Sequence, residues 1–231
     1  MLQFGSSTRI VDKYNMGDRA RKAMESSSVP KSICFAPAQN ADDHQFDMQK
    51  IVDGVKLILE GIGENVDREG LLETPARVAR MYKELVCATG VNPATEITCR
   101  FHENTDELVL VRDIPFSSIC EHHLVPFMGT AHVGYIPRDG VITGLSKLAR
   151  VVELASKRLQ VQERMTTQIA DALMEKLDPV GVVVVLEAEH LCMSIRGIKK
   201  PGAKTVTSAV RGIVATDQAT RAEVMALINR G

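Results

Sequence analysis

Two short stretches of cysteine and histidine, far apart in the chain, constrain the fold more than any other feature of this sequence. They are Cys120-Glu121-His122-His123 and Glu189-His190-Leu191-Cys192. Thiolate and neutral imidazole are the side-chain groups that bind Zn²⁺ well in proteins. The C-x-x-H spacing of Cys120 and His123 can direct both at one ion, and Cys192 can add a third ligand from a different strand. A fold that uses all three must bring the two stretches together.

Three protein ligands would leave the fourth zinc position for water, which distinguishes a catalytic site from a closed structural one. His122 and His190 each lie beside a proposed ligand, so we expect them to line the pocket as acid–base groups. A second interpretation stays open at this point, because a buried apolar thiol and a hydrogen-bonded core histidine would give the same pattern. The other cysteines form no C-x-x-C pair, which disfavours a closed structural site.

Composition sets broad limits on the class of protein. The 231 residues, 45% hydrophobic and 25% charged, suit a soluble globular chain with one large domain or one domain with additions. The net charge of -1 gives no electrostatic case for binding nucleic acid or membrane. No apolar run approaches the ~20 residues of a membrane-spanning helix, and the N-terminus lacks the apolar core of a signal peptide. Five loosely spaced cysteines indicate a reducing cytoplasm rather than a disulfide framework.

The chain divides into a variable N-terminal tail, residues 1–43, and a domain over 44–231. The serine- and proline-containing tail predicts a poorly ordered terminus or a short helix. Within the domain we expect a helical part, 44–95, and a mixed part, 96–231. Apolar residues recur at helical spacing from Asp47 to about Glu60, and a second helix should follow with Thr74 as its N-cap and Pro75 in its first turn.

The mixed part predicts an α+β arrangement of two antiparallel hairpins flanking a helix pair. The loop Ser117–Gly129 should carry the first metal-binding stretch, and His190–Ile195 should continue or pair beside a strand. Strands are expected at Leu108–Phe116, Ala131–Ile136, Val182–Glu187 and Lys204–Val214. The first helix of the pair should begin with Ser146 as its cap, and the second should begin near Gln162. A capping box formed by Thr220 and Glu223 should lie in a final helix. A sheet of three or four strands leaves open edges, so we expect oligomerisation.

A cluster of cationic side chains at the start of a helix predicts an anion site. Ser146, Lys147 and Arg150 would combine with free helical N–H groups, which favour anions. Arg196 could bring another cation, and Arg77 stands in a first helical turn, where a cation opposes the helix dipole. An ordinary solvated helix start and an exposed surface arginine are the alternatives.

Gln162-Glu163 precedes an apolar helix and admits two interpretations. One is a favourable acidic first turn. The other is recognition of guanine, whose N1–H and 2-amino group are adjacent donors that one carboxylate can accept together. With a zinc site and a cationic helix start, this suggests a guanine nucleotide with several phosphates. The chain has no G-x-x-x-x-G-K-[ST] motif, so it is no P-loop GTPase.

At these residues the sequence resembles the GTP cyclohydrolase I family. The resemblance runs in register from about Asp47 to the C-terminus. It is carried by Ser118–Phe127 (SICEHHLVPF), His132–Pro137, Gly144–Val152 (GLSKLARVV), Gln160–Thr166 (QVQERMT) and Glu189–Gly197 (EHLCMSIRG) with Lys200-Pro201-Gly202.

The resemblance implies an enzyme that converts GTP and water to 7,8-dihydroneopterin triphosphate and formate, the first step towards folates or tetrahydrobiopterin. Zinc-activated water would attack C8 of guanine. Its fold would be the tunnelling fold, assembled as a toroidal homodecamer of two pentamers with active sites between subunits. The resemblance implies that one Zn²⁺ per subunit is bound by Cys120, His123 and Cys192, and that His122 and His190 carry protons. It implies that Glu163, with Gln162 beside it, binds guanine and takes part in proton transfer. The implied triphosphate contacts are Ser146, Lys147, Arg150, Arg196 and Arg77.

Two other classes of function were weighed. A non-catalytic, zinc-stabilised nucleotide-binding oligomer of the same fold would need neither His122 nor His190, and the presence of both favours the enzyme. A zinc nucleobase deaminase would need an H-x-E motif and a later P-C-x-x-C, and the chain has neither.

Overall fold

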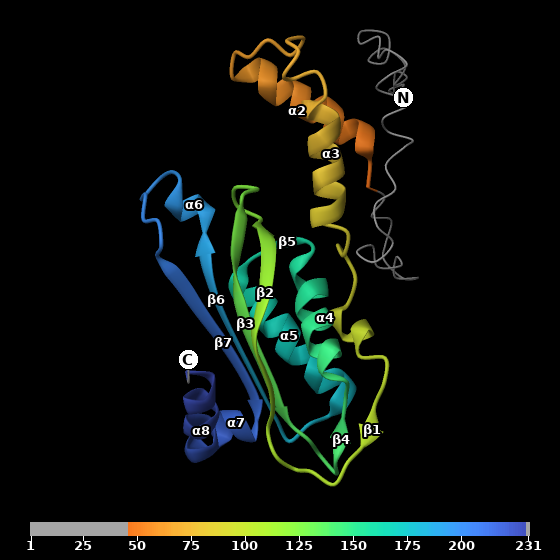
Figure 1. Cartoon of the computed structure of the whole chain (residues 1–231), viewed down its shortest axis with the longest axis vertical. Coiled ribbons are helices and arrows are strands. Elements are labelled where there is room, and N and C mark those ends of the chain that lie inside the picture. The colour runs from red at the N-terminus through yellow and green to blue at the C-terminus, as the bar shows by residue number, and fades with distance from the viewer. Residues whose placement is uncertain (1–45, 230–231) are drawn as a thin grey trace, which may run out of the picture. The chain divides into compact units, whose positions relative to one another are not determined.

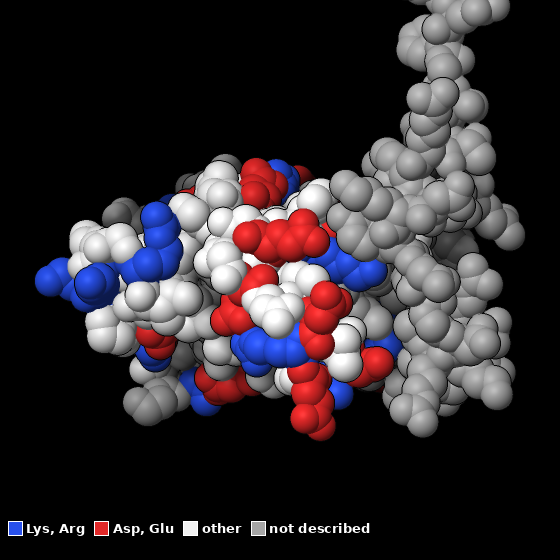
Figure 2. All heavy atoms as spheres, turned by 90° about the horizontal axis from the view of Figure 1, so that it is seen from above, with Lys and Arg blue, Asp and Glu red and all other residues white. Residues whose placement is uncertain are grey.

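The computed structural model describes residues 46–229, which form two compact units, 46–84 and 85–229. Each is described by itself below. The predicted tail, 1–43, lies outside the described residues. Among residues 46–229 no helix is both long and apolar enough to span a membrane. On the face drawn in Figure 2, acidic and basic side chains are interspersed, as the near-zero net charge leads one to expect.

The first unit consists of two helices, α2 (Met48–Gly61) and α3 (Thr74–Leu85, whose last residue belongs to the second unit). The Asp47 carboxylate caps α2 by accepting a 3.0 Å hydrogen bond from the Lys50 backbone N–H, which confirms the predicted start of this helix. Thr74 was predicted to be the N-cap of the next helix, but it already belongs to α3 as its first residue.

The second unit is built on a five-stranded sheet in the order β5-β2-β3-β6-β7 (Figure 1). The four long strands pair antiparallel, and the short β5 joins β2 in parallel. Their bounds are β2 Val109–Cys120, β3 Pro126–Ile136, β5 Leu159–Gln160, β6 Gly181–His190 and β7 Lys204–Gly212. Two-residue strands β1 (Phe101–His102) and β4 (Val141–Ile142) form a separate ribbon.

Helices α4 (Leu145–Ser156) and α5 (Gln162–Leu177) cover one face of this sheet (Figure 1). The short helices of the unit are η3 (Pro93–Glu96), α6 (Leu191–Ser194), α7 (Ile213–Thr216) and α8 (Gln218–Ile228). The apolar faces of α4 and α5 are buried, among them Leu148, Val151, Met165, Ile169 and Leu173. These side chains make the main core with the inward side of β2, β3 and β6.

The valine run of β6 is buried on both faces of the sheet. Val182, Val184 and Leu186 point into the core beneath α4 and α5. Val183 and Val185, which alternate with them, pack in a second cluster with Val224 and Ile228 of α8. The unbroken apolar run in the sequence therefore reflects two covered faces of one strand.

Several predicted boundaries were wrong. The expected loop Ser117–Gly129 is strand at both ends, because the β2–β3 ladder continues to the pair Ile119 and Pro126 and leaves only residues 121–125 as a turn. Ser118, a polar residue that suggested a loop, is buried and donates to the Ser156 carbonyl at 2.6 Å. Of the segment His190–Ile195 only His190 is strand, because α6 begins directly after it.

The predicted helix caps also need correction. Gly144 occupies the N-cap position of α4 without a side-chain bond, so Ser146 is no cap. The Asp217 carboxylate caps α8 by accepting from the Thr220 backbone N–H at 2.7 Å, which places Thr220 inside the helix. The last long strand ends at Gly212, whose φ of 60° begins the turn into α7. The sheet has five strands rather than three or four, since the pair Leu159-Gln160 adds an edge beside β2.

Candidate active site

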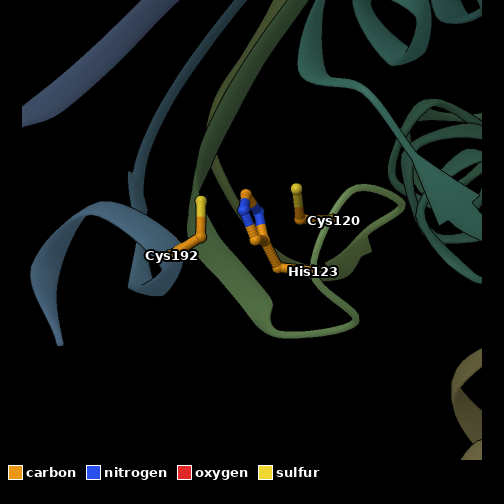
Figure 3. A group of neighbouring side chains, drawn as sticks. All are labelled: Cys120, His123 and Cys192. Atoms are coloured by element: carbon orange, nitrogen blue, oxygen red, sulfur yellow. The ribbon is translucent and has the colours of Figure 1, made fainter. Parts of the chain in front are cut away.

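The two cysteine–histidine stretches meet at one edge of the sheet. Cys120 is the last residue of β2, His123 lies in the turn to β3, and Cys192 lies in α6, directly after β6. The register explains the meeting, because β3 places Pro126 opposite Ile119 of β2 and Phe127 opposite His190 of β6. The ligand atoms of Cys120, His123 and Cys192 all lie within 4.8 Å of one another, and Figure 3 shows the three side chains converging on one space.

The turn that carries His123 is held on both sides. The Leu124 N–H donates to the Cys120 carbonyl and the Cys120 N–H donates to the Val125 carbonyl, each at 2.9 Å. Leu124 adopts a φ of 55°, which is costly for a side chain of this kind and persists only in a well-held turn. At the first residue of the turn, the Glu121 N–H donates to the Gln160 carbonyl at 3.0 Å, so β5 anchors the segment.

An ion pair on the side of α5 supports the same turn. Arg164 donates to the Glu121 carboxylate and, through Nε, to Gln160 Oε1 at 3.0 Å. The hydrogen bond from the Arg164 guanidinium is the main reason why the pKa of the Glu121 carboxyl is lowered. The pair is largely exposed, so its contribution lies in orientation more than in stability.

The donor set of this centre suits a soft divalent cation such as Zn²⁺, with two sulfur ligands and one imidazole. Burial raises the pKa of the Cys192 thiol and nearby Cys120 raises it further, whereas Arg196 acts in the opposite direction. Two thiolates this close repel each other, and a cation between them would relieve the repulsion. The residues present therefore fit a metal centre with three protein ligands.

His122 and His190, the predicted proton carriers, both lie at this centre. His122 Nδ1 is 3.8 Å from Cys120 Sγ, and its ring is exposed. The half-buried His190 ring stacks on Phe127 with centroids 4.6 Å apart and planes within 1°. Burial lowers the pKa of His190, with Glu163 partly opposing the effect. Burial thus favours the neutral form of the His190 ring.

Gln162 and Glu163 are neighbours with different environments. Glu163 is exposed in the first turn of α5, where a ligand can reach it. Gln162 is 1% exposed, and its amide Nε2 donates to the carbonyls of Leu186 and Thr205 at 3.2 and 3.0 Å. Its Oε1 lies 2.7 Å from His190 Nε2. The Gln162 side chain is thus committed to contacts inside the chain, and only Glu163 is free to meet a base edge.

The predicted triphosphate contacts occupy different places, and the first turn of α4 lies far from this centre. The far end of α4 abuts the sheet edge near Cys120, since the Ser156 carbonyl accepts from Ser118. Ser146 and Lys147 lie in the first turn of α4, about 15 Å away along an axis that rises 1.5 Å per residue. Arg196 is exposed and close enough to Cys192 to influence its thiol. Arg77 belongs to α3 of the first unit, and its role stays a prediction.

Some supporting residues escaped prediction from the sequence. In the sequence, Phe127 could be identified only as an apolar residue between a proline and a methionine, which does not indicate a contact with His190. Arg164 resembled any cation on an exposed helix face. Thr207, on β7, had no signal at all, because its partner Gln162 becomes its neighbour only through the packing of α5 on the sheet.

Comparison with known proteins agrees with the geometry. Residues 51–229 match the family described as GTP cyclohydrolase I. GTP cyclohydrolase 1 of Carboxydothermus hydrogenoformans is 63% identical over 182 residues, 79% of this chain and 95% of the relative. GTP cyclohydrolase 1 of Listeria monocytogenes is 59% identical over 184 residues, 80% of this chain and 97% of the relative. A solved structure of the archaeosine synthase QueF-Like in the apo form covers 46% of this chain and 93% of its own with 17% identity and a TM-score of 0.38, too weak a likeness to support an inference. The chain belongs to the GTP cyclohydrolase I family.

Proposed function

We propose that this chain catalyses the GTP cyclohydrolase I reaction, in which GTP and water give 7,8-dihydroneopterin triphosphate and formate. One observation carries the proposal. Two segments remote in sequence place the ligand atoms of Cys120, His123 and Cys192 within 4.8 Å of one another, with two further histidines beside them, in a chain of this family. A purely structural metal site would need neither His122 nor His190.

The metal site is proposed to hold Zn²⁺ through Cys120, His123 and Cys192. A zinc ion there would supply Lewis-acid chemistry, lowering the pKa of water at its open position towards neutrality. The protein's own contribution is to fix the direction of the ligands. The turn 121–125 is closed by backbone hydrogen bonds, and Cys192 is set by the junction of β6 and α6. Both supports are rigid elements, which suits a site that must keep one position open.

Proton transfer during opening of the guanine imidazole ring is assigned to His122 and His190. Ring opening must deliver protons to nitrogen, and imidazole is the side chain whose proton exchange suits neutral pH. Burial favours the neutral form of His190, and stacking on Phe127 holds its plane. His122 is more exposed and can exchange protons with solvent.

Guanine recognition is assigned to the exposed carboxylate of Glu163. It can accept from N1–H and the 2-amino group of guanine together, a pair that adenine does not offer. Glu163 is also close enough to His190 to raise the pKa of that ring against the effect of burial. A base edge bound to Glu163 would therefore lie beside a proton carrier. We propose Glu163 as a participant in proton transfer as well.

The triphosphate would be bound by Arg196 from one chain and by Ser146, Lys147 and Arg150 from a neighbouring chain. The distance along α4 supports this division, because its first turn lies far from the metal ligands of the same chain. Among the described residues, the edge strand β7 pairs with β6 alone, and Val206 on it is 59% exposed. An open edge of this kind can pair with another subunit. We propose a toroidal assembly of two pentamers, with active sites between subunits.

Subunit complementation tests this division directly. Cys192→Ser and Lys147→Ala should each lose activity as pure oligomers. After the two are unfolded and refolded together in equal amounts, activity should return to about one quarter of the wild-type value, since each site needs an intact contribution from both chains. Absence of any recovery would place the whole site within one chain.

His122→Ala separates the enzyme from a non-catalytic relative. The variant should bind the same amount of zinc as the wild type and lose formate release from GTP. If it releases formate at the wild-type rate, His122 carries no proton in this reaction. If the wild-type protein itself binds GTP and zinc without releasing formate, the chain is a non-catalytic nucleotide-binding oligomer.

A further inference from the structure

A buried polar network behind His190 involves residues to which the proposed mechanism gives no task. It joins α5, β6 and β7 through the side chains of Gln162, Thr166 and Thr207. Gln162 and Thr166 are each 1% exposed, and Thr207 is half-buried. Buried hydroxyl and amide groups are costly unless they are hydrogen-bonded, so every proton in this network should have an acceptor.

The direction of each hydrogen bond follows from two backbone carbonyls. Gln162 Nε2 lies 3.2 Å from the Leu186 carbonyl and 3.0 Å from the Thr205 carbonyl. A carbonyl oxygen can only accept, so the nitrogen of the amide must face these two groups. The reversed amide would place its oxygen against two oxygens. Gln162 Oε1 is therefore the atom that faces His190, at 2.7 Å from its Nε2.

The two threonines complete the same pattern. The Thr166 hydroxyl lies 2.7 Å from the Gln162 backbone carbonyl and must donate its one proton there. Thr207 lies 2.6 Å from Thr166, so the proton between them must come from Thr207. The Thr207 oxygen then faces Gln162 Nε2 at 3.1 Å as an acceptor, and it shares the two amide hydrogens with the carbonyls of Leu186 and Thr205. All three groups around Gln162 Nε2 are therefore acceptors, which fixes the orientation of the amide.

We propose that Gln162, held by Thr207 and Thr166, is a positioning residue that fixes the proton of His190 on Nε2 and leaves Nδ1 as the nitrogen with the free lone pair. Amide oxygen accepts and cannot donate, so His190 Nε2 must carry a hydrogen for the 2.7 Å contact to be favourable. The stacked Phe127 ring opposes a half-turn of the imidazole, which would put Cε1 in the place of Nε2 against Gln162 Oε1. The role of Gln162 is then to orient His190 rather than to touch guanine.

Neutron diffraction from deuterated crystals of the full-length protein tests the proton arrangement without reference to activity. Crystals at about pH 8 lie above the ordinary histidine pKa of about 6.5. Deuterium is expected on His190 Nε2, directed at Gln162 Oε1, and on the Gln162 amide nitrogen, directed at the carbonyls of Leu186 and Thr205. A His190 ring without deuterium on Nε2, or an amide in the opposite orientation, would overturn the proposal.

Steady-state kinetics test the positioning role of Gln162. This kinetic test rests on the proposed function of His190 in proton transfer. Thr207→Val keeps size and strand preference but removes the hydroxyl. We expect kcat to fall about tenfold with KM for GTP within about twofold, and Thr207→Ser to restore kcat to within about twofold. The matched control is Thr130→Val, at a half-buried threonine of β3 outside the network, which should leave both constants unchanged.

The outcomes separate this inference from the proposed function. An unchanged kcat in Thr207→Val, or a loss that Thr207→Ser does not restore, contradicts the positioning role. Wild-type protein without GTP cyclohydrolase activity contradicts the proposed function, and the neutron experiment still decides the arrangement of protons around His190.

Discussion

Phe127 links the core of the sheet to the candidate proton carrier, and replacing it separates stability from catalysis. Its side chain is fully buried, packs edge-on against Phe116 with centroids 6.0 Å apart, and stacks on the His190 ring at 4.6 Å. Phe116 is also buried, but within residues 46–229 it stacks on no histidine. The two phenylalanines therefore make a matched pair, in which one touches the site and the other does not.

Leucine at either position retains an apolar side chain of similar size. Such replacements cost up to about 1.5 kcal/mol in packing, and loss of the edge-on aromatic pair adds about 0.5–1.5 kcal/mol. Phe116→Leu should therefore destabilise the chain by about 1–2 kcal/mol. Phe127→Leu also loses the stack on His190, so about 2–3 kcal/mol is expected for it.

Catalysis should respond differently from stability. Without the Phe127 ring, the His190 imidazole can tilt, and small misplacements of a reacting group are costly in rate. We expect kcat for formate release to fall about tenfold in Phe127→Leu and to stay within about twofold of wild type in Phe116→Leu. Denaturant unfolding gives the two stabilities, and steady-state assays below the unfolding transition give the rates. Equal kcat values in the two variants would refute the argument that Phe127 holds the ring.

Three further predictions concern the ligands, the base contact and a helix cap. Cys120→Ser and Cys192→Ser should each lose bound zinc and activity together, by metal analysis and assay, and full turnover in either would show that the residue is no ligand. Glu163→Ala should keep its zinc and raise the Kd for GTP by at least about tenfold, the effect of losing a hydrogen bond to a charged group; unchanged GTP affinity would remove Glu163 from the guanine contact. Hydrogen bonding to Thr220 lowers the pKa of Asp217 in the folded chain, so the stability it gives is present above the ordinary carboxyl pKa and is lost as pH falls through the folded value. Asp217→Asn keeps an N-cap without a charge, so its melting temperature should fall less than that of the wild type between about pH 5 and pH 3, and equal falls would contradict the assignment.

The order of helices and strands could be predicted from the sequence because most of it depends on local periodicity. The start of α2 at Asp47, the buried faces of α4 and α5 and the valine strand β6 all have patterns that one segment carries by itself. The convergence of Cys120, His123 and Cys192 was predictable from residue chemistry, since few combinations other than a metal site use these types at this spacing.

Features that depend on tertiary pairing were not predictable. Ser118 suggested a loop, but the ladder of β2 and β3 extends past it, and its hydroxyl finds the Ser156 carbonyl from another element. The strand β5 has only two residues and exists because β2 lies beside it. The different environments of Gln162 and Glu163 were also hidden, because neighbours in sequence appear equivalent until packing buries one side chain and exposes the other.

The separation of α4's first turn from the metal ligands was also hidden from the sequence. The motif with Ser146, Lys147 and Arg150 indicates an anion site without saying which chain's metal it serves. Helix length and the contact at Ser156 show that this first turn lies far from the metal ligands of its own chain. The proposed division of the site between subunits rests on this separation.

The most direct test of this account is formate release from GTP by the purified protein, before and after metal removal, with zinc and magnesium added back separately. The account predicts formate together with a pterin that is fluorescent after oxidation, loss of both on chelation, and recovery with zinc alone. Full activity in protein shown to be free of metal would contradict the assignment of Cys120, His123 and Cys192 as the catalytic metal centre.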